Sequence, residues 1–163
     1  MKDKMKEVLE VLEKDARLTP EEIAGQTGLG TEEVRNFIKE MEAQGIIKSY
    51  RAMIDWEKYG DESVYAIIEV QLSPERNVGY DAVAERISRF PEVVTCMLIS
   101  GDHDLHLLIK GKTMKEVAFF VAEKIAPLNQ VNHTATHFLL RRYKNEGEIL
   151  FEKEADTRLV IHP

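Results

Sequence analysis

The chain contains 163 residues, 44% of them hydrophobic and 31% charged, and its formal net charge at pH 7 is −7. This composition is typical of a globular protein and excludes a disordered or fibrous chain. The longest apolar runs are interrupted by Glu69, His106 or Arg141, so none reaches the roughly 20 residues of a membrane-spanning helix.

The acidic net charge argues against DNA binding by the chain as a whole, because affinity for DNA comes largely from Lys and Arg side chains that neutralise phosphates. Residues through Asp55 include nine basic and twelve acidic side chains, and the rest include thirteen and seventeen, so neither half is basic. A DNA-binding function therefore depends on where the basic residues lie along one face. Units of about 50 to 100 residues bury a modest share of their surface, and we expect self-association.

A single cysteine, Cys96, excludes an intrachain disulfide, and residues 1–14 show no charged-then-apolar signal segment. We therefore expect a cytoplasmic protein. Cys96 alternates with Val94 and Leu98 and is best explained as a small strand residue, since no base is paired with it in the sequence. No catalytic residue is predicted.

The N-terminal segment predicts two short helices. Apolar side chains recur at helical spacing over residues 5–14, which is typical of an amphipathic helix. A second helix is predicted to begin after Thr19, whose hydroxyl can cap it, with Pro20 in the first position and Glu22 completing a capping box. Gly28 can adopt the left-handed conformation that ends this helix.

A third helix is predicted after the tight Gly28-Leu29-Gly30 turn, with Thr31 as its cap and Gly45 at its end. Short helices joined in this way are typical of a helix-turn-helix, whose last helix enters the major groove, although a plain three-helix bundle has the same pattern. The basic, β-prone segment 46–51 follows at once and predicts a wing that contacts the DNA backbone. The wing favours a winged helix-turn-helix.

The second half predicts the order β-α-β-β-α-β, in which helices cover one face of an antiparallel sheet in a ferredoxin-like arrangement. The fold class is therefore α+β. Several positions on the other face are too apolar to remain exposed, so we expect a partner chain to pack there: Tyr65, Ile67, Met97, Ile99 and Leu108. The predicted strands are 64–72, 93–100, 105–109 and 131–143, and the predicted helices are 80–87 and a segment that opens with a Thr113 to Glu116 capping box and ends at Pro127.

Several segments carry a resemblance to a known family, through their order and spacing: Val11-Leu12-Glu13-Lys14-Asp15-Ala16-Arg17-Leu18-Thr19, Leu29-Gly30, Gly45-Ile46-Ile47, Tyr50-Arg51-Ala52, Phe90-Pro91-Glu92-Val93, Ser100-Gly101-Asp102-His103-Asp104 and Thr134-Ala135-Thr136. Together they resemble the Lrp/AsnC family of feast/famine transcriptional regulators. The resemblance implies a DNA-binding regulator that pairs through its sheets as a homodimer, which can stack into a tetramer or octamer, and a second domain of the type that regulates amino-acid metabolism (RAM).

The domain organisation expected from these readings has four parts. Residues 1–50 form the winged helix-turn-helix, 51–62 a linker strand, and 63–143 the ferredoxin-like RAM domain. Residues 144–163 form a C-terminal hairpin extension, with Ile149-Leu150-Phe151 and Leu159-Val160-Ile161 as its arms and a turn around Ala155-Asp156.

DNA contacts are expected from the third helix and the wing. Arg35 and Asn36 carry donors suited to guanine and adenine edges, whereas Lys39, Lys48 and Arg51 would mainly neutralise phosphates. Thr31 and Ser49 are expected to contact phosphates as well. Three carboxylates oppose binding because they lie beside these residues: Glu32, Glu33 and Glu40.

The resemblance implies that a small-molecule effector, commonly an amino acid, binds between dimers near the turn Gly101-Asp102-His103-Asp104. Asp102 and Asp104 match the acidic positions of the family, whereas His103 departs from the aromatic residue often found there. A zwitterion needs a carboxylate for its ammonium and donors for its carboxylate, and Ser100, Gly101, Thr134 and Thr136 can supply the donors. A solvated Gly-Asp turn is the alternative interpretation.

The histidines invite a metal hypothesis, because His103 and His106 lie near two aspartates while His133 and His137 share one strand face. Histidines on strands are more often partly buried polar residues, so neither a metal nor a cofactor is predicted. Two other functions remain open. One is a siroheme-decarboxylase-like enzyme of the same architecture, and the other is a sensor or interaction module without DNA binding.

Overall fold

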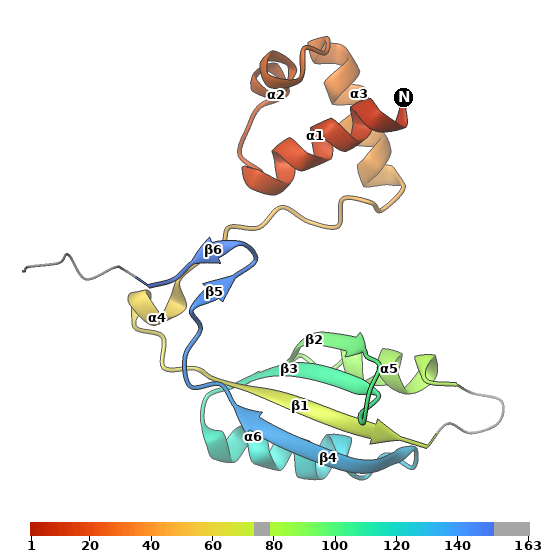
Figure 1. Cartoon of the computed structure of the whole chain (residues 1–163), viewed down its shortest axis with the longest axis vertical. Helices are drawn as coiled ribbons and strands as arrows, with labels where there is room; N and C mark the ends of the chain where they lie inside the picture. The colour runs from red at the N-terminus through yellow and green to blue at the C-terminus, as the bar shows by residue number, and fades with distance from the viewer. Residues whose placement is uncertain (74–78, 152–163) are drawn as a thin grey trace, which may run out of the picture. The chain divides into compact units, whose positions relative to one another are not determined.

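The computed structural model describes residues 1–73 and 79–151, and the chain divides after Ile54 into two compact units. The first unit contains the helices α1 (Lys2–Lys14), α2 (Pro20–Thr27) and α3 (Thr31–Ala43) (Figure 1). One small core joins all of them, made of Val8, Leu12, Ile23, Ala24, Val34, Phe37 and Met41. The predicted three-helix order is confirmed.

The turn chemistry of the sequence explains where α2 begins and ends. The hydroxyl of Thr19 accepts a hydrogen bond from the Glu22 backbone N–H at 3.3 Å, and the Glu22 carboxylate accepts one from the Thr19 backbone N–H at 2.7 Å. This is the predicted capping box. Gly28 ends the helix at a φ of 68°, in the left-handed region.

The start of α3 differs from the prediction. Its N-cap is Gly30, and Thr31 is the first helical residue and makes no capping hydrogen bond. The assignment of Thr31 as the cap was therefore wrong by one position. Glycine is among the residues preferred at the N-cap, although it has no side chain to accept a capping hydrogen bond.

The segment after α3 contains no strand in residues 46–54, so the predicted wing lacks its β-structure. The backbone N–H groups of Ile46 and Ile47 instead donate to the carbonyl of Met41. The linker strand predicted over residues 51–62 is also wrong, since this range contains the short helix α4 (Trp56–Tyr59). A β-prone segment forms a strand only when another strand satisfies its backbone groups, and no strand in the described part of the chain pairs with this segment.

The second unit has the predicted β-α-β-β-α-β order. Its sheet is antiparallel throughout, with the spatial order β2-β3-β1-β4, which is ferredoxin-like. The elements are β1 (Val64–Leu72), α5 (Asp81–Ser88), β2 (Val93–Leu98), β3 (Leu105–Gly111), α6 (Met114–Phe120), continued by a π-helical turn η1 (Val121–Ile125), and β4 (Val131–Phe138).

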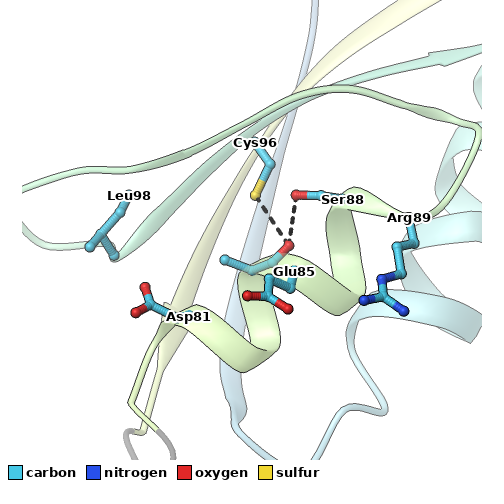
Figure 2. A pocket seen from close by; sticks show the side chains of 7 residues that line it. Asp81, Glu85, Ser88, Arg89, Cys96 and Leu98 are labelled. Atoms are coloured by element: carbon cyan, nitrogen blue, oxygen red, sulfur yellow. Dashed lines mark hydrogen bonds between the residues drawn. The ribbon is translucent and has the colours of Figure 1, made fainter. Parts of the chain in front are cut away.

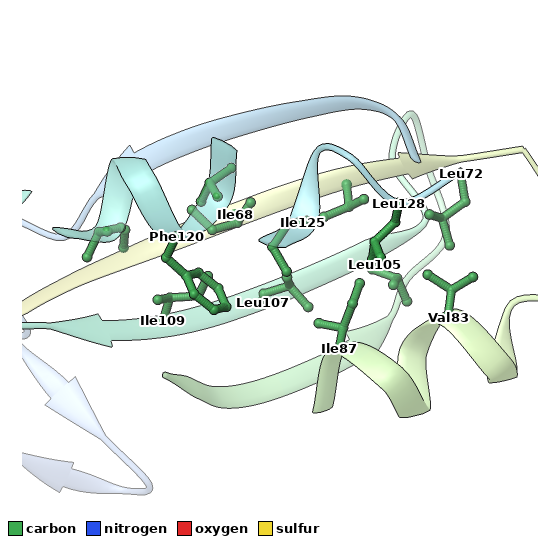
Figure 3. Close-up of a cluster of buried hydrophobic side chains, with 14 residues drawn as sticks. Ile68, Leu72, Val83, Ile87, Leu105, Leu107, Ile109, Phe120, Ile125 and Leu128 are labelled. Atoms are coloured by element: carbon green, nitrogen blue, oxygen red, sulfur yellow. The ribbon is translucent and has the colours of Figure 1, made fainter. Parts of the chain in front are cut away.

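The helices α5 and α6 cover the same face of this sheet, and the core lies between the helices and the sheet (Figure 3). Ala66, Ile68 and Val70 of β1 are fully buried there, which confirms the alternation predicted over residues 64–72. The helices contribute Val83 and Ile87 from α5. The side chains of the other face lie on the side away from the helices.

Some element ends differ from the prediction. The last strand ends at Phe138 instead of Tyr143, and β2 ends at Leu98 instead of Ser100. The Thr113 hydroxyl accepts from the Glu116 N–H, but the Glu116 carboxylate accepts from the Lys112 N–H at 2.6 Å, so the reciprocal half of the capping box is shifted by one residue.

A hairpin follows β4, earlier than predicted. β5 (Lys144–Asn145) pairs with β6 (Glu148–Ile149), and Glu146 and Gly147 between them both have positive φ. This geometry is that of a type I′ turn, for which glycine in the second position is suited. The arm predicted at Leu159-Val160-Ile161 and the turn at Ala155-Asp156 lie outside the described residues.

Among the residues that the structure describes, no helix is both long and apolar enough to cross a membrane.

Replacing Leu107, which is fully buried, by alanine is expected to lower the free energy of unfolding by about 2–5 kcal/mol, because it leaves a cavity between sheet and helices. Urea denaturation followed by circular dichroism measures this. Leu140 is 90% exposed, so Leu140→Ala is a matched control expected to change stability by less than about 0.5 kcal/mol. Equal losses in the two variants would contradict this account of the core.

Candidate DNA interface and effector region

The exposed face of α3 is the candidate DNA interface. Val34, Phe37 and Met41 form its buried stripe, and successive residues of a helix are rotated by roughly 100°. Asn36 and Lys39 therefore point away from the core, and both are exposed. The structure thus places these two predicted contact residues on one accessible surface.

Arg35 lies on the flank of α3 that faces α2. Its guanidinium donates a hydrogen bond to the Glu21 carboxylate in the first turn of α2, and its other terminal nitrogen lies 3.7 Å from a carboxylate oxygen of Glu32. The backbone N–H of Glu21 and the Arg35 guanidinium lower the pKa of the Glu21 carboxyl. The Glu21 carboxylate in turn raises the pKa of Arg35. No local sequence pattern indicates this role of Glu21, because its partner lies 14 positions away in another helix.

The opposite flank of α3 carries a second ion pair. The Nζ atom of Lys4 in α1 lies 3.1 Å from a carboxylate oxygen of Glu33. Glu40 accepts a hydrogen bond from the Gln44 amide at 2.9 Å. Glu32 lies near Arg35. The three carboxylates expected to oppose DNA binding, Glu32, Glu33 and Glu40, therefore each have a partner within the protein.

The segment that follows α3 presents further basic groups. Lys48, Ser49 and Arg51 are exposed, and the Tyr50 hydroxyl between them donates a hydrogen bond to the Glu42 carboxylate of α3 at 2.9 Å. Partial burial, together with this carboxylate, raises the pKa of Tyr50. This hydrogen bond attaches residues 48–51 to α3, so the basic residues of this segment and those of α3 belong to one structure.

In the turn between β2 and β3, Ser100, Gly101 and Asp102 are exposed, with Gly101 at a φ of 131°. Asp104 has a different environment. Its carboxylate accepts a hydrogen bond from the Leu72 backbone N–H at 2.7 Å, and its own backbone N–H donates to the Val70 carbonyl. Asp104 therefore joins the turn to the end of β1, and its carboxylate is already engaged.

Thr134 and Thr136 lie in β4, opposite Val70 and Ile68 of β1. Opposed residues of an antiparallel pair point to the same face, so both threonines are on the helix-covered side of the sheet. β4 forms one edge of the sheet, while the turn that holds Ser100 leaves β2 at the other edge. A single chain does not bring all the predicted effector residues into one pocket.

The uncovered face of the sheet carries a cluster around Glu69, which sequence reasoning missed. A carboxylate oxygen of Glu69 lies 3.2 Å from Nε2 of His137 and 3.7 Å from Nδ1 of His103. The rings of His103 and His133 are 6.4 Å apart, and His106 is opposite Glu69 in the register. Strand alternation gives the face of each residue, but only the register shows that these residues are neighbours.

This cluster is not arranged as a metal site. Across residues 1–73 and 79–151, no group of three or more His, Cys, Asp or Glu side chains is placed to hold a metal ion.

A shallow groove of about 530 Å³ lies between α5 and β2 (Figure 2). The hydroxyl of Ser88 and the thiol of Cys96 both donate to the Ala84 carbonyl, at 2.7 and 3.9 Å. No histidine is among the residues that line the groove. The remaining lining residues are Asp81, Glu85, Arg89 and Leu98.

A family model described as "Lrp/AsnC ligand binding domain" matches residues 65–149, and one described as "Winged helix-turn-helix DNA-binding" matches residues 1–48. The chain is 43% identical over 162 residues to YugG, an uncharacterized HTH-type transcriptional regulator of Bacillus subtilis, covering 99% of this chain and 98% of the relative. It is 32% identical over 137 residues to the HTH-type transcriptional regulator LrpA of Pyrococcus horikoshii, covering 84% and 94%.

Solved structures share the fold. A transcriptional regulator of Neisseria meningitidis, NMB0573, in complex with L-Met, has a TM-score of 0.69 at 23% identity, covering 87% of this chain and 91% of that chain. The leucine response regulatory protein LrpA of Mycobacterium tuberculosis has a TM-score of 0.74 at 20% identity, covering 91% and 98%. These likenesses support the α+β architecture.

The hydrogen bond to Leu72 predicts that Asp104 acts mainly in stability. Asp104→Ala leaves the Leu72 N–H, at a position that is only 6% exposed, without its partner, and is expected to cost about 1–3 kcal/mol of unfolding free energy. Chemical denaturation measures the loss. Asp102→Ala removes an exposed carboxylate from the same turn and is the control, expected to leave stability unchanged. If Asp102→Ala is destabilised and Asp104→Ala is not, the structural role belongs to Asp102 and the stabilising role given to Asp104 is wrong.

Proposed function

Because the chain belongs to the Lrp/AsnC family of transcriptional regulators, we propose that it binds double-stranded DNA as a homodimer or larger assembly, under the control of a small molecule of the amino-acid class. Its relatives are regulators with a helix-turn-helix and a ligand-binding domain, so the chain is a regulator and not an enzyme. The siroheme-decarboxylase alternative is thereby removed. We assign residues 1–50 to DNA binding and 63–143 to effector binding and assembly, and we place the protein's action in the cytoplasm.

The observation that carries the DNA-binding proposal is the accessible surface of α3 and the segment attached to it. The Asn36 amide has the donor and acceptor that an adenine edge requires, and Arg35 has donors for guanine. Lys39, Lys48 and Arg51 are exposed and can neutralise phosphates. Thr31 at the start of α3 and Ser49 are the proposed neutral phosphate contacts.

The uncovered sheet face supports the assembly proposal. Met97 is 45% exposed and Ile99 37% exposed in one chain, and Ile67 and Leu108 are partly buried beside them. A second copy on this face would remove these apolar groups from water. It would also present two DNA-binding units at once, and the gain in effective concentration offsets the weak contacts of an acidic protein.

The effector proposal follows from the incomplete site. Ser100, Gly101 and Asp102 are accessible in the turn between β2 and β3, whereas Thr134 and Thr136 lie on the opposite edge strand of the same sheet. An assembly can place the turn of one copy beside a strand of another and complete the polar set. The complex of NMB0573 with L-Met supports an amino acid as the class of effector.

The proposal is tested by mobility shift of the purified chain with a duplex covering its own promoter, at low and physiological salt, with and without amino acids. A shift that weakens with salt and changes with one amino acid is the expected result. Absence of retention at any salt by a folded oligomer would favour the sensor module that does not bind DNA.

Lys39→Ala is expected to weaken binding to all duplexes and to lower the slope of log affinity against log salt by about 1 for each DNA-bound subunit, because each subunit loses one phosphate contact. Fluorescence anisotropy over a salt series measures the slope. Lys115→Ala, in α6 of the other unit, removes the same charge and is expected to leave the slope unchanged. If both variants alter it equally, Lys39 is not a phosphate contact.

Met97→Glu is expected to weaken self-association at least roughly tenfold, since it places a charge within the proposed sheet-to-sheet interface. Sedimentation velocity over a concentration series measures the association. Phe119→Glu, which changes a 51% exposed residue of α6 on the other side of the sheet, is the matched control. If Phe119→Glu dissociates the assembly and Met97→Glu does not, the interface lies on the helices and not on the uncovered sheet face.

A further inference from the structure

The basic residues of the DNA-binding unit are of two kinds. Arg35 contacts the carboxylates of Glu21 and Glu32. Lys39, Lys48 and Arg51 take part in none of the ion pairs found within the described part of the chain, and all are exposed. The positive charge of Arg35 is therefore compensated by carboxylates in the DNA-free protein, whereas the charges of Lys39, Lys48 and Arg51 are not.

The pair with Glu21 joins two helices. Glu21 lies in the first turn of α2, whose start is held by the Thr19 capping box, and Arg35 lies in α3, where its neighbour Val34 is fully buried. Both backbone positions are thus held by packed or capped structure. Because the guanidinium is planar, hydrogen bonding to a carboxylate on α2 restricts its orientation and its distance from α3.

Compensation changes what an arginine can contribute to DNA binding. The salt dependence of affinity reports cations that neutralise phosphates and release counterions. The group of Glu21, Glu32 and Arg35 carries a formal charge of −1, so it does not attract phosphates. Base reading depends instead on donors held in a fixed geometry, and the guanidinium has five N–H donors, more than its two carboxylate partners require.

We propose that Glu21 is a positioning residue for Arg35, and that the Glu21-held Arg35 sets the specificity for one base while the unpaired Lys39, Lys48 and Arg51 supply affinity. This inference rests on the proposed DNA-binding function and deepens it. The base contacted by Arg35 is a guanine, since its O6 and N7 accept two parallel hydrogen bonds from one guanidinium. Glu21 touches no base itself and acts through Arg35.

The experiment first selects duplexes from a library with about 30 randomised base pairs, using the unsubstituted full-length chain. Affinities of Glu21→Gln and Arg35→Gln are then measured for the selected duplex and for each of its single base-pair changes, over a salt series. Arg35→Gln is expected to lose discrimination, by roughly tenfold, at one guanine position. Glu21→Gln is expected to lose discrimination at the same position, with a salt slope that is unchanged or steeper.

Glu33→Gln is the matched control. It makes the same change of charge in the first turn of α3, but the partner of Glu33 is Lys4, so the contacts of Arg35 remain. It is expected to keep full discrimination. The double variant Glu21→Gln/Arg35→Gln is expected to discriminate no worse than Arg35→Gln alone. This is expected because Glu21 acts only through the contact that Arg35 makes with the base. Thermal melts of all variants check that each is folded.

Two results would overturn the inference. One is a Glu21→Gln variant that discriminates as well as Glu33→Gln does. The other is an Arg35→Gln variant that lowers the salt slope by about 1 for each DNA-bound subunit and leaves discrimination intact, which would make Arg35 a phosphate contact. Failure of the unsubstituted chain to select any duplex would overturn the proposed function itself, so the two failures are distinguishable.

Discussion

The sheet of the second unit is covered by helices on one face only, and the rest of its organisation depends on this asymmetry. Side chains alternate between the faces of a strand, so Ile68 is fully buried under the helices while its neighbour Ile67 lies on the face that no helix covers. The same alternation places Glu69 on the open face, beside His103 and His137. An open, partly apolar face is what allows a two-layer domain to pair with a copy of itself.

In the first unit, the corresponding constraint is the small core that fixes α3 against α1 and α2. With Val34 and Met41 buried, one flank of α3 meets α2 and the other meets α1. Each flank carries an interhelical ion pair, through Arg35 and Glu33 respectively. This arrangement pairs two of the carboxylates near the contact surface, those of Glu21 and Glu33, with the cations of Arg35 and Lys4.

Local signals predicted most elements. The capping box at Thr19 and the left-handed Gly28 define α2, and alternation gave β1 with its bounds. Predictions failed where formation depends on a distant partner. Residues 46–54 are β-prone but pair with no strand among the described residues, and the last strand stops at Phe138, where its register with β1 ends.

The sequence by itself determined the order of elements, their buried faces, the family and the exposed residues Asn36 and Lys39, because these follow from periodicity and turn chemistry within a few residues. Tertiary structure alone decided that Glu21 pairs with Arg35, that the Asp104 carboxylate accepts a hydrogen bond from the last residue of β1, and that Glu69 lies beside His103 and His137. Those pairs are separated by 14 to 68 positions along the chain. Packing and strand register brought them together, and neither is encoded in a local pattern.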